Sequence, residues 1–288
     1  MMLNSDELTP IAPRHWPELR DLFKVDWPRH EIAHSTVQNY INWNAIDPRI
    51  KQLEVLTLND SWRQSGTYII IDRYYMFIYT LEESKHTIHR VLLLIDWDYS
   101  YKISHVPESL RPILYKVFQM RSVELQITGR PTNLYKLPME KCLTLDCTAP
   151  PGVTLHKLEL HHATQINTVW PHRCEGSEYT LKRLIAWNPS MGLFDESGRL
   201  LAWSLCWTTG TLAALQVDAE HLRKGFGSLV VRAVAKEMTK VGMNCQAIVH
   251  CANEISNAMF TKLGFEVVGS CFVVRTKARK LVEYVHES

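Results

Sequence analysis

The hydrophobic and polar positions of the first half form one helix pattern followed by strand patterns. Apolar residues recur at helix-face spacing over residues 16–23, which predicts an amphipathic helix. Three runs rich in Val, Ile, Tyr and Phe then predict strands at residues 53–58, 67–81 and 89–97. A helix that opens on a proline is predicted over residues 107–120.

The second half is more regular. Residues 136–152 hold prolines at positions 138, 150 and 151 and no helical period, so we expect a linker there. The elements predicted after it are, in order, strand 153–158, helix 161–170, a helix between Ser177 and Asn188, strands 191–194, 200–207 and 211–217, helix 225–241, strand 244–250, helix 253–263 and strand 266–276. This order predicts an α/β fold with a mixed sheet in two domains, residues 1–148 and 149–288.

Local signals mark several of these boundaries. Gly198 and Gly210 stand near the ends of two tight turns, where hairpins use a positive φ. Ser177 is a residue type that caps helices, and Asn188-Pro189 is a typical helix stop. We therefore expect three hairpin-connected strands between two helices.

Composition and charge narrow the classes of function. The chain has 288 residues, 46% hydrophobic and 22% charged, with a formal net charge of +2, too small to argue for a nucleic-acid partner. Seven cysteines, an odd number without a Cys-x-x-Cys pair, favour free thiols and no metal site. The longest apolar runs are too short for a membrane span, and no signal peptide is evident. We expect an intracellular protein, cytoplasmic in the first instance, with a mitochondrial location left open.

The segment most suggestive of chemistry is residues 217–228, where a strand ends, a loop turns and a helix begins at Gly225 and Gly227. A helix start offers unpaired N–H groups and the positive end of the macrodipole, and glycines let phosphate oxygens approach. Arg223 and Lys224 add positive charge. An ordinary strand-to-helix turn explains the same residues equally well. A dinucleotide-binding fold needs a third glycine where Val230 stands, so it fits less well.

A second segment follows about thirty residues later. Residues 253–265 read as a helix capped by Asn253 and ended by Gly264, followed by a strand. In this order, residues 153–288 resemble a GCN5-related N-acetyltransferase (GNAT) domain, and within that superfamily they are most similar to the glycine N-acyltransferase-like group. The family motif Arg/Gln-x-x-Gly-x-Gly/Ala matches residues 222–227 at both glycines, but Leu222 stands in place of Arg or Gln.

The later family motif runs from an asparagine through a small residue to Tyr-x-x-x-Gly-Phe. Asn253 and Ser256 match it, and Phe260 occupies the tyrosine position. The similarity to glycine N-acyltransferases rests further on residues 202–205, on residues 209–210 and on Glu220.

The resemblance implies acyl-CoA as cosubstrate, without a metal, and direct attack of an amine on the thioester. By the match, the residues that contact coenzyme A are Gln216, Val217, Arg223, Lys224, Gly225, Phe226, Gly227, Ser228, Asn253, Ser256 and Phe260. A backbone N–H near Gln216 or Val217 would stabilise the oxyanion. Glu220 is the candidate base and His250 the second. A surface glutamate and a packed strand-end histidine are the plain alternatives.

Three functions fit these motifs. The first is an N-acyltransferase acting on glycine or another small amino acid. The second acetylates a protein or peptide amine. The third is a catalytically silent acyl-CoA-binding or scaffold protein, favoured by Leu222 and Phe260. Trp203 and Trp207 share one face of a strand and either pack in the core or line an acyl or acceptor pocket. The N-terminal half has no motif, and a degenerate copy of the same fold is one interpretation of it.

Overall fold

The computed structural model describes residues 6–280 and residue 282. By its internal contacts the chain divides into two compact units, which we call unit 1 (Met1–Thr132 and Ser270–Ser288) and unit 2 (Asn133–Gly269). Two strands, β7 (Pro131–Leu137) and β13 (Glu266–Thr276), contribute residues to both units. The internal contacts divide the chain between residues 132 and 133 and again between residues 269 and 270. The domain boundary expected between residues 148 and 149 stays a prediction.

Unit 1 is built on a mixed sheet whose order is β1, β2, β3, β4, β5 and the second half of β13. Its further strands are β1 (Leu8–Pro10), β2 (Leu53–Leu58), β3 (Tyr68–Asp72), β4 (Tyr75–Tyr79), β5 (Lys102–Pro107) and β6 (Leu125–Ile127). β4 and β5 run parallel, and β13 pairs antiparallel with β5. The last strand of the chain therefore completes the unit that the first half builds.

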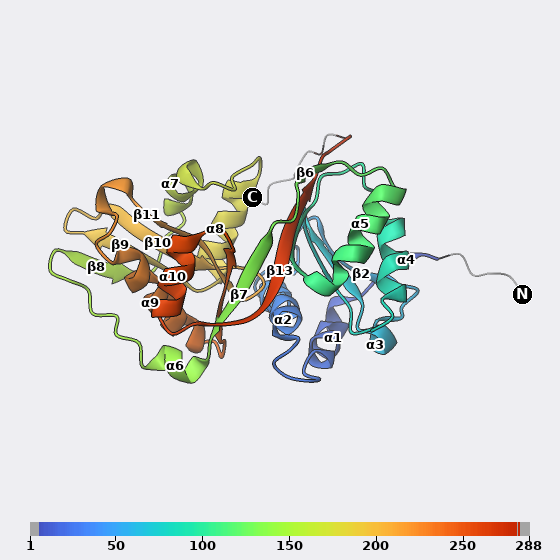
Figure 1. Ribbon diagram of the computed structural model, residues 1–288, viewed down its shortest axis with the longest axis horizontal. Coiled ribbons are helices and arrows are strands. Elements are labelled where there is room, and N and C mark those ends of the chain that lie inside the picture. The colour runs from blue at the N-terminus through green and yellow to red at the C-terminus, as the bar shows by residue number, and fades with distance from the viewer. Residues whose placement is uncertain (1–5, 281, 283–288) are drawn as a thin grey trace, which may run out of the picture. The chain divides into compact units, whose positions relative to one another are not determined.

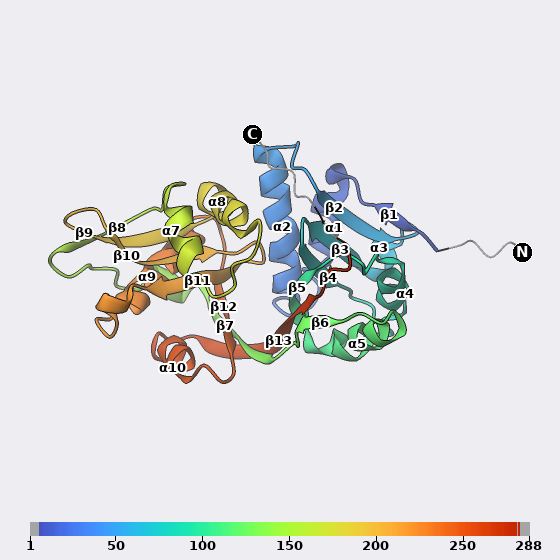
Figure 2. The ribbon, with the colours of Figure 1, turned by 90° about the horizontal axis from the view of Figure 1, so that it is seen from above.

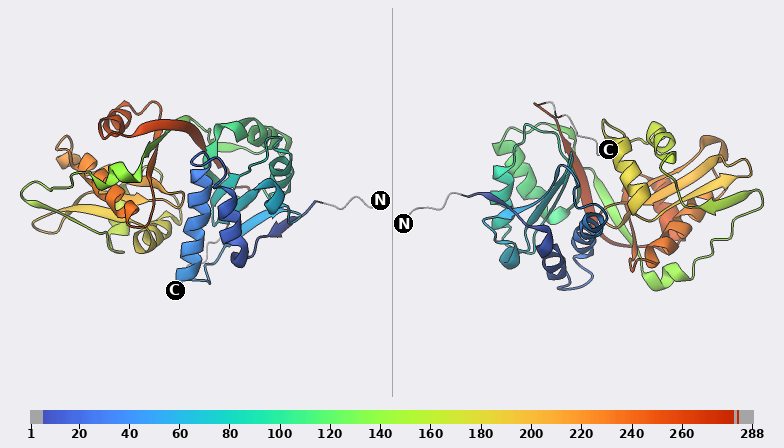
Figure 3. Two further views of the ribbon diagram at one scale, coloured as in Figure 1. Left: turned by 90° about the horizontal axis from the view of Figure 1, so that it is seen from below. Right: turned by 180° about the vertical axis from the view of Figure 1, so that it is seen from behind.

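Helices cover both faces of the sheet in unit 1 (Figures 1 and 3). One face packs against α4 and α5, whose buried side chains join those of the strands in one apolar cluster. The other face packs against α1 and α2, where Phe23 contacts the rings of Tyr68 and Tyr79 edge-on. The helices are α1 (Trp16–Leu22), α2 (Glu31–Ile46), α3 (Trp62–Ser65), α4 (His86–Leu94) and α5 (Arg111–Met120).

Unit 2 contains the sheet β8, β9, β10, β11, β12 and β7, in that order. Its own strands are β8 (Val153–His156), β9 (Ser190–Asp195), β10 (Leu200–Cys206), β11 (Thr211–Val217) and β12 (Cys245–His250). Neighbouring strands are antiparallel from β8 to β11, whereas β11 and β12 are parallel. Gly198 and Gly210 adopt φ of 84° and 75° in the two hairpin turns, as predicted.

The helices of unit 2 lie on both faces of its sheet (Figures 1 and 2). They are α6 (Met139–Leu143), α7 (His162–Val169), α8 (Ser177–Trp187), α9 (Phe226–Thr239) and α10 (Glu254–Lys262). The buried face of α9 joins β9, β10, β11 and β12 in one apolar cluster, which also takes in Phe260 of α10. α7 and α8 lie on the opposite face of the sheet.

The structure confirms the mixed α/β fold and corrects four local predictions. Residues 89–97, predicted as a strand, lie largely in α4, because Ile88, Val91, Leu92 and Ile95 form one buried helical stripe. The predicted strand 67–81 is the hairpin of β3 and β4, which turns at Arg73 with a φ of 60°.

The linker prediction for residues 136–152 and the cap prediction for Ser177 are also wrong in detail. The linker range contains the end of β7 and the helix α6, which is anchored by the buried Cys142. Gly176 precedes α8, and the hydroxyl of Ser177 donates to Asn167 Oδ1 at 2.6 Å instead of capping its helix. The pattern did not predict α2 or β5. Within the described residues, no helix is long and apolar enough to cross a membrane.

Candidate functional site

The strands β11 and β12 separate soon after they begin. Their parallel pairing is limited to Thr211 with Gln246 and Leu212 with Ala247. Beyond that point β11 contains a bulge, since its register with β10 shifts by one residue and Ala214 adopts a φ of 49°. A bulge bends a strand and increases its twist. The last residues of β11 therefore lack a strand partner on the side of β12.

The backbone groups at this unpaired edge can be assigned from the strand geometry. The N–H of Asp218 donates to the carbonyl of Leu201 on β10 at 2.7 Å, and Trp203 pairs with Gln216. Because successive peptide groups in a strand point to opposite edges, Gln216 faces β10, while Leu215 and Val217 face away from it. Of the two residues predicted to donate an N–H to the oxyanion, Gln216 and Val217, only Val217 has its N–H at the unpaired edge. The sequence analysis did not single out Leu215, whose backbone shares this edge.

The loop after β11 leads directly into α9. Asp218 caps a short 3₁₀ turn by accepting the N–H of Glu220 at 3.0 Å. Gly225 has a φ of 81° and is the N-cap of α9, and its carbonyl accepts the N–H of Leu229. Among the described residues, the N–H groups of Phe226, Gly227 and Ser228 have no acceptor. These three amides and the helix macrodipole offer an anion a preformed set of donors.

The space around the two glycines differs. A Cβ atom on Gly225 would meet nothing within 4 Å, so this glycine is required by its left-handed φ. A Cβ atom on Gly227 would lie 3.3 Å from Val217 Cγ2, so this glycine allows α9 to begin close to the end of β11. Phe226 between them is buried and anchors the first turn of α9 in the core. The helix start is therefore fixed beside the unpaired edge of β11.

The charged residues of the loop are on the surface. Arg223 and Lys224 are exposed, and Lys224 Nζ lies 3.2 Å from His221 Nδ1. Leu222, at the motif position usually held by Arg or Gln, is 57% exposed. The positive charge beside the helix start thus comes from two exposed side chains, which suits a phosphate ligand that arrives from solvent.

The candidate base Glu220 lies in the 3₁₀ turn with its side chain 70% exposed. Its carboxylate forms an ion pair with Arg199 at 3.1 Å, and the same guanidinium binds Asp218 at 2.7 Å. Hydrogen bonds from the N–H of Glu220 and from Arg199 lower the pKa of Asp218. To take a proton from an amine, the carboxylate of Glu220 has to leave its ion pair with Arg199 and bind the amine instead.

The second candidate base, His250, stands at the end of β12. Its Nδ1 accepts the N–H of Ala252 at 3.2 Å, which assigns the ring proton to Nε2. The Nε2 atom is buried and has no hydrogen-bond partner among the described residues. His250 therefore presents one unsatisfied nitrogen within unit 2.

The start of α10 is held by a polar network that the sequence analysis missed. Asn257 Nδ2 donates to the carbonyls of His250 at 3.0 Å and Asn253 at 2.8 Å, while its Oδ1 accepts from Asn133 Nδ2 and Tyr135 Oη, each at 2.9 Å. One side chain thus ties the end of β12 to α10 and β7. Asn257 stands four residues after Asn253 and so on the same face of the helix, and this spacing could have predicted that the two residues act together.

The other predicted residues of α10 are used within the helix. Asn253 caps it, as predicted, by accepting the N–H of Ser256 at 3.1 Å. Phe260 is 3% exposed and packs between the rings of Tyr135 and Phe265, with centroids 5.6 and 5.0 Å away. No hydroxyl is therefore present at the position where the motif has a tyrosine. The ring stacked on Phe260 belongs to Tyr135, which does carry a hydroxyl.

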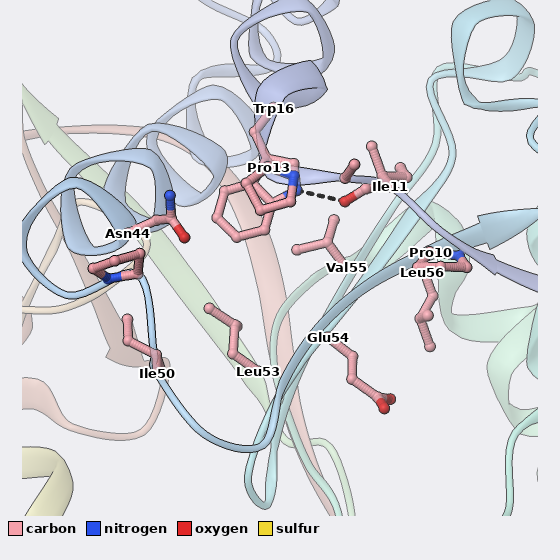
Figure 4. Close-up of a pocket in the computed structure, with 12 residues that line it drawn as sticks. Pro10, Ile11, Pro13, Trp16, Asn44, Ile50, Leu53, Glu54, Val55 and Leu56 are labelled. Atoms are coloured by element: carbon pink, nitrogen blue, oxygen red, sulfur yellow. Dashed lines mark hydrogen bonds between the residues drawn. The ribbon is translucent and has the colours of Figure 1, made fainter. Parts of the chain in front are cut away.

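A hollow of about 400 Å³ lies in unit 1, away from these residues in the chain (Figure 4). Its lining is largely apolar, with Asn44 and Glu54 as polar exceptions, and the indole of Trp16 donates to the carbonyl of Ile11 at its rim. It contains no lysine or arginine, so it is a poor phosphate site. Among residues 6–280 and 282, no group of three His, Cys, Asp or Glu residues could hold a metal ion.

Comparisons with known proteins identify the fold. Residues 190–274 match the family model described as FR47-like protein. A Drosophila protein of known X-ray structure is 21% identical, with a TM-score of 0.87 over 96% of this chain and 100% of that one. No curated protein matched the sequence.

Two further solved structures carry descriptive names. A tandem GNAT protein from the clavulanic acid biosynthesis pathway is 12% identical, with a TM-score of 0.54 over 97% of this chain and 100% of that one. A GCN5-related N-acetyltransferase from Sphaerobacter thermophilus is 11% identical, with a TM-score of 0.58 over 99% of each chain. The GNAT fold predicted from the motifs is thus present.

Proposed function

We propose that this chain, which has the fold of the GCN5-related N-acetyltransferases, transfers an acyl group from acyl-CoA to an amine. The observation that carries the proposal is the set of unpaired amides at Phe226, Gly227 and Ser228, directly beside the unpaired edge of β11. A diphosphate bound at the helix start leaves the rest of coenzyme A free to follow that edge.

The reaction follows from this arrangement. The pantetheine arm of coenzyme A carries amide groups, which suit the free backbone edge at Leu215 and Val217. The N–H of Val217 then donates to the thioester oxygen as negative charge develops on it. The amine attacks the thioester carbon, loses a proton to a base, and the CoA thiolate leaves. Holding both reactants in register can supply roughly 7–11 kcal/mol of the barrier.

Glu220 and His250 remain the two candidates for the base. Glu220 requires release of its carboxylate from Arg199. His250 requires a free lone pair on Nε2, whereas the hydrogen bond accepted by Nδ1 assigns the ring proton to Nε2, so that proton has to move to Nδ1 first. The pH dependence of the variants separates them, because Glu220→Gln or His250→Gln should remove a neutral-pH limb of the rate profile only for the residue that takes the proton.

We further propose that the acceptor is glycine or another small amino acid. The support is the similarity of residues 202–205, residues 209–210 and Glu220 to the glycine N-acyltransferase-like group. An acetyltransferase for peptide amines would require a longer acceptor than glycine. Assays with acceptors of different length therefore distinguish the two hypotheses.

A second candidate function is binding of acyl-CoA without turnover. It is favoured by the buried, hydroxyl-free Phe260, because general acid help to the leaving thiolate is worth roughly 10²–10⁴-fold. A thiol with an ordinary pKa of about 8.5 is nevertheless a tolerable leaving group, so the loss of the tyrosine is expected to slow an enzyme and not to abolish it.

Thiol release from a series of acyl-CoAs with glycine, other amino acids and short peptides tests the proposal, with coenzyme A binding followed by calorimetry. Release that saturates with an amino acid supports the transferase. Saturable binding without release supports the silent protein, and release with peptides alone removes the small acceptor. Absence of binding at millimolar coenzyme A contradicts both.

A further inference from the structure

Two of the buried polar atoms in unit 2 that lack a hydrogen-bond partner in the described part of the chain belong to Trp203 and Thr180. Trp203 on β10 and Thr180 on α8 are each 2% exposed. The indole Nε1 of Trp203 and the hydroxyl of Thr180 have no hydrogen-bond partner among the described residues. A buried polar group without a hydrogen-bond partner is destabilising, so these two atoms call for a ligand or a water.

The two side chains are on the same face of the sheet. On β10, Ala202 and Cys206 point into the cluster with α9, so Trp203, which alternates with them, points to the face of α7 and α8. α8 packs on β10. Along α8, Ser177, Thr180 and Leu184 recur at helical spacing and are buried, so Thr180 belongs to the stripe that faces the sheet.

The two are also at the same level along the sheet. The end of α8 is tied to the end of β10, because Asn188 Nδ2 donates to the carbonyl of Cys206 at 3.0 Å. From this common anchor, Thr180 lies eight helical residues back, roughly 12 Å. Trp203 lies three strand residues back, roughly 10 Å.

The other end of α8 fixes its direction. Ser177 Oγ, in the first turn of α8, donates to Asn167 Oδ1 on α7 at 2.6 Å. Gln165, also on α7, donates to the carbonyl of Leu200 at the start of β10 at 3.2 Å. α8 and β10 thus run side by side in the same direction, and Thr180 and Trp203 stand at a similar level along them.

This level is the one at which the proposed thioester lies. Trp203 is the direct cross-strand neighbour of Gln216, so the two side chains stand on the same face about 5 Å apart at Cβ. Val217, the proposed oxyanion donor, is the next residue of β11. Trp203 therefore stands one strand away from the residue proposed to bind the thioester oxygen.

We propose that Trp203 Nε1 and Thr180 Oγ1 form the acceptor subsite, and that they bind the carboxylate of an amino acid whose amine attacks the thioester. An indole N–H donates only, so its partner must be a hydrogen-bond acceptor such as a carboxylate oxygen, and a threonine hydroxyl can donate to the same group. In an α-amino acid a single carbon separates the amine from the carboxylate. This short separation suits a carboxylate bound by Trp203 and an amine that attacks the thioester held by Val217, the residue next to the cross-strand partner of Trp203. This inference rests on the proposed acyl transfer and names its acceptor site.

A direct test uses the indole N–H signals of the full-length protein labelled with ¹⁵N-tryptophan and saturated with coenzyme A. The Trp203 signal is identified as the one lost in Trp203→Phe. Added glycine is expected to shift this signal downfield, whereas ethylamine, which has no carboxylate, leaves it in place. A Trp203 signal that does not move at saturating glycine overturns the subsite.

Kinetics supply an independent test. Trp203→Phe and Thr180→Val keep most of the buried volume and remove one donor each. Each is expected to raise KM for glycine at least about tenfold, the scale of a hydrogen bond to a charged group, and to leave KM for acetyl-CoA within twofold. Trp97→Phe is the matched control, because its indole already donates to the carbonyl of Leu92 at 2.8 Å. An unchanged KM for glycine in both donor variants contradicts the inference.

The two proposals fail in different ways. Turnover of glycine with a static Trp203 signal and an unchanged KM removes the subsite and keeps the acyl transfer. A glycine-dependent shift of the signal in a protein that shows no thiol release keeps the subsite and removes the transfer. If Trp203→Phe does not fold, Thr180→Val carries the kinetic test and the NMR signal is assigned by its response to that variant.

Discussion

At the scale of single residues, the start of α9 combines three conditions that a phosphate ligand needs. Gly225 supplies a left-handed backbone, Gly227 permits the approach of Val217, and Ser228 in the first turn adds no charge. The presence of both glycines could be noted from the sequence, since their spacing is a local signal. The role of Gly227 could not, because the crowding atom is ten residues away in the chain.

The neutral side chain of Ser228 in the first turn of α9 gives a prediction. Ser228→Asp adds a carboxylate to the first turn of α9, where it should preserve or slightly raise the melting temperature through the helix dipole. The same carboxylate should repel the diphosphate and weaken coenzyme A binding at least about tenfold by calorimetry. Ser228→Asn, which is similar in size and neutral, is the control and should bind within a few-fold of wild type. Equal affinity of the two variants would place the diphosphate elsewhere.

His105 gives a prediction for stability. Burial, with a contribution from the charge of Lys102, lowers the pKa of His105 to about 3, against an unfolded value of about 6.5. Below pH 6.5 the unfolded chain binds a proton that the folded chain does not, so stability falls as the pH drops from about 6.5 towards 3.

The expected slope is about 1.4 kcal/mol per pH unit from this residue alone. Urea unfolding at pH 7 and pH 5 measures it, and His105→Gln should lose less stability than wild type over the same interval. An identical pH dependence in both proteins would show that folding does not lower the pKa of His105.

At the scale of elements, the site depends on the separation of β11 from β12. Pairing stops after Leu212, and the bulge at Ala214 redirects the strand. The residues of β11 predicted a strand correctly, yet nothing in them predicted a left-handed alanine. The bulge arises from register with β10, which is a property of two strands and not of one.

The bulge can be tested by substitution. Ala214→Gly should be neutral or stabilising by up to about 1 kcal/mol, because glycine adopts a positive φ without strain. Ala214→Val should destabilise by more than that, since a β-branched residue is poorly tolerated there, and should weaken coenzyme A binding by straightening β11. Thermal melts and calorimetry on both variants check this. Normal binding by a stably folded Ala214→Val would show that the bulge is not required.

At the scale of the whole molecule, the two units repeat one order of elements. In each, a hairpin is followed by a loop, a helix, a parallel strand and a further helix: β3, β4, α4, β5 and α5 in unit 1, and β10, β11, α9, β12 and α10 in unit 2. The parallel pairing is equally short in both, since β4 and β5 pair at Tyr75 and Met76 alone. The interpretation of the first half as a degenerate copy agrees with this order.

The two helix starts differ in what occupies them. In unit 1 the carboxylate of Glu82 accepts the N–H of Thr87 at 2.7 Å, in the first turn of α4. Burial would raise the pKa of Glu82, but hydrogen bonds from Thr87 and Ser84 and the charge of His86 together lower it. The loop of residues 80–85 also has no glycine. The anion site of unit 1 is therefore filled by the chain itself.

This difference predicts one coenzyme A per chain. Calorimetry with coenzyme A should give a stoichiometry near one, and Ser228→Asp should remove that single event, because the equivalent helix start in unit 1, that of α4, is occupied by Glu82. A second binding event that survives in Ser228→Asp would mean that Glu82 yields its place to a phosphate.

The sequence by itself determined the elements of the second half, the glycine spacing at the helix start and the resemblance to the GNAT family, because these depend on local periodicity and short motifs. Tertiary structure alone decided that residues 89–97 lie largely in a helix, that β13 ends in unit 1 and that Val217 and not Gln216 faces the unpaired edge. It also decided that the polar atoms of Trp203 and Thr180 are buried without hydrogen-bond partners among the described residues. Each of these depends on which strand or helix lies opposite, and the energy of a buried polar or apolar group is set by that neighbour.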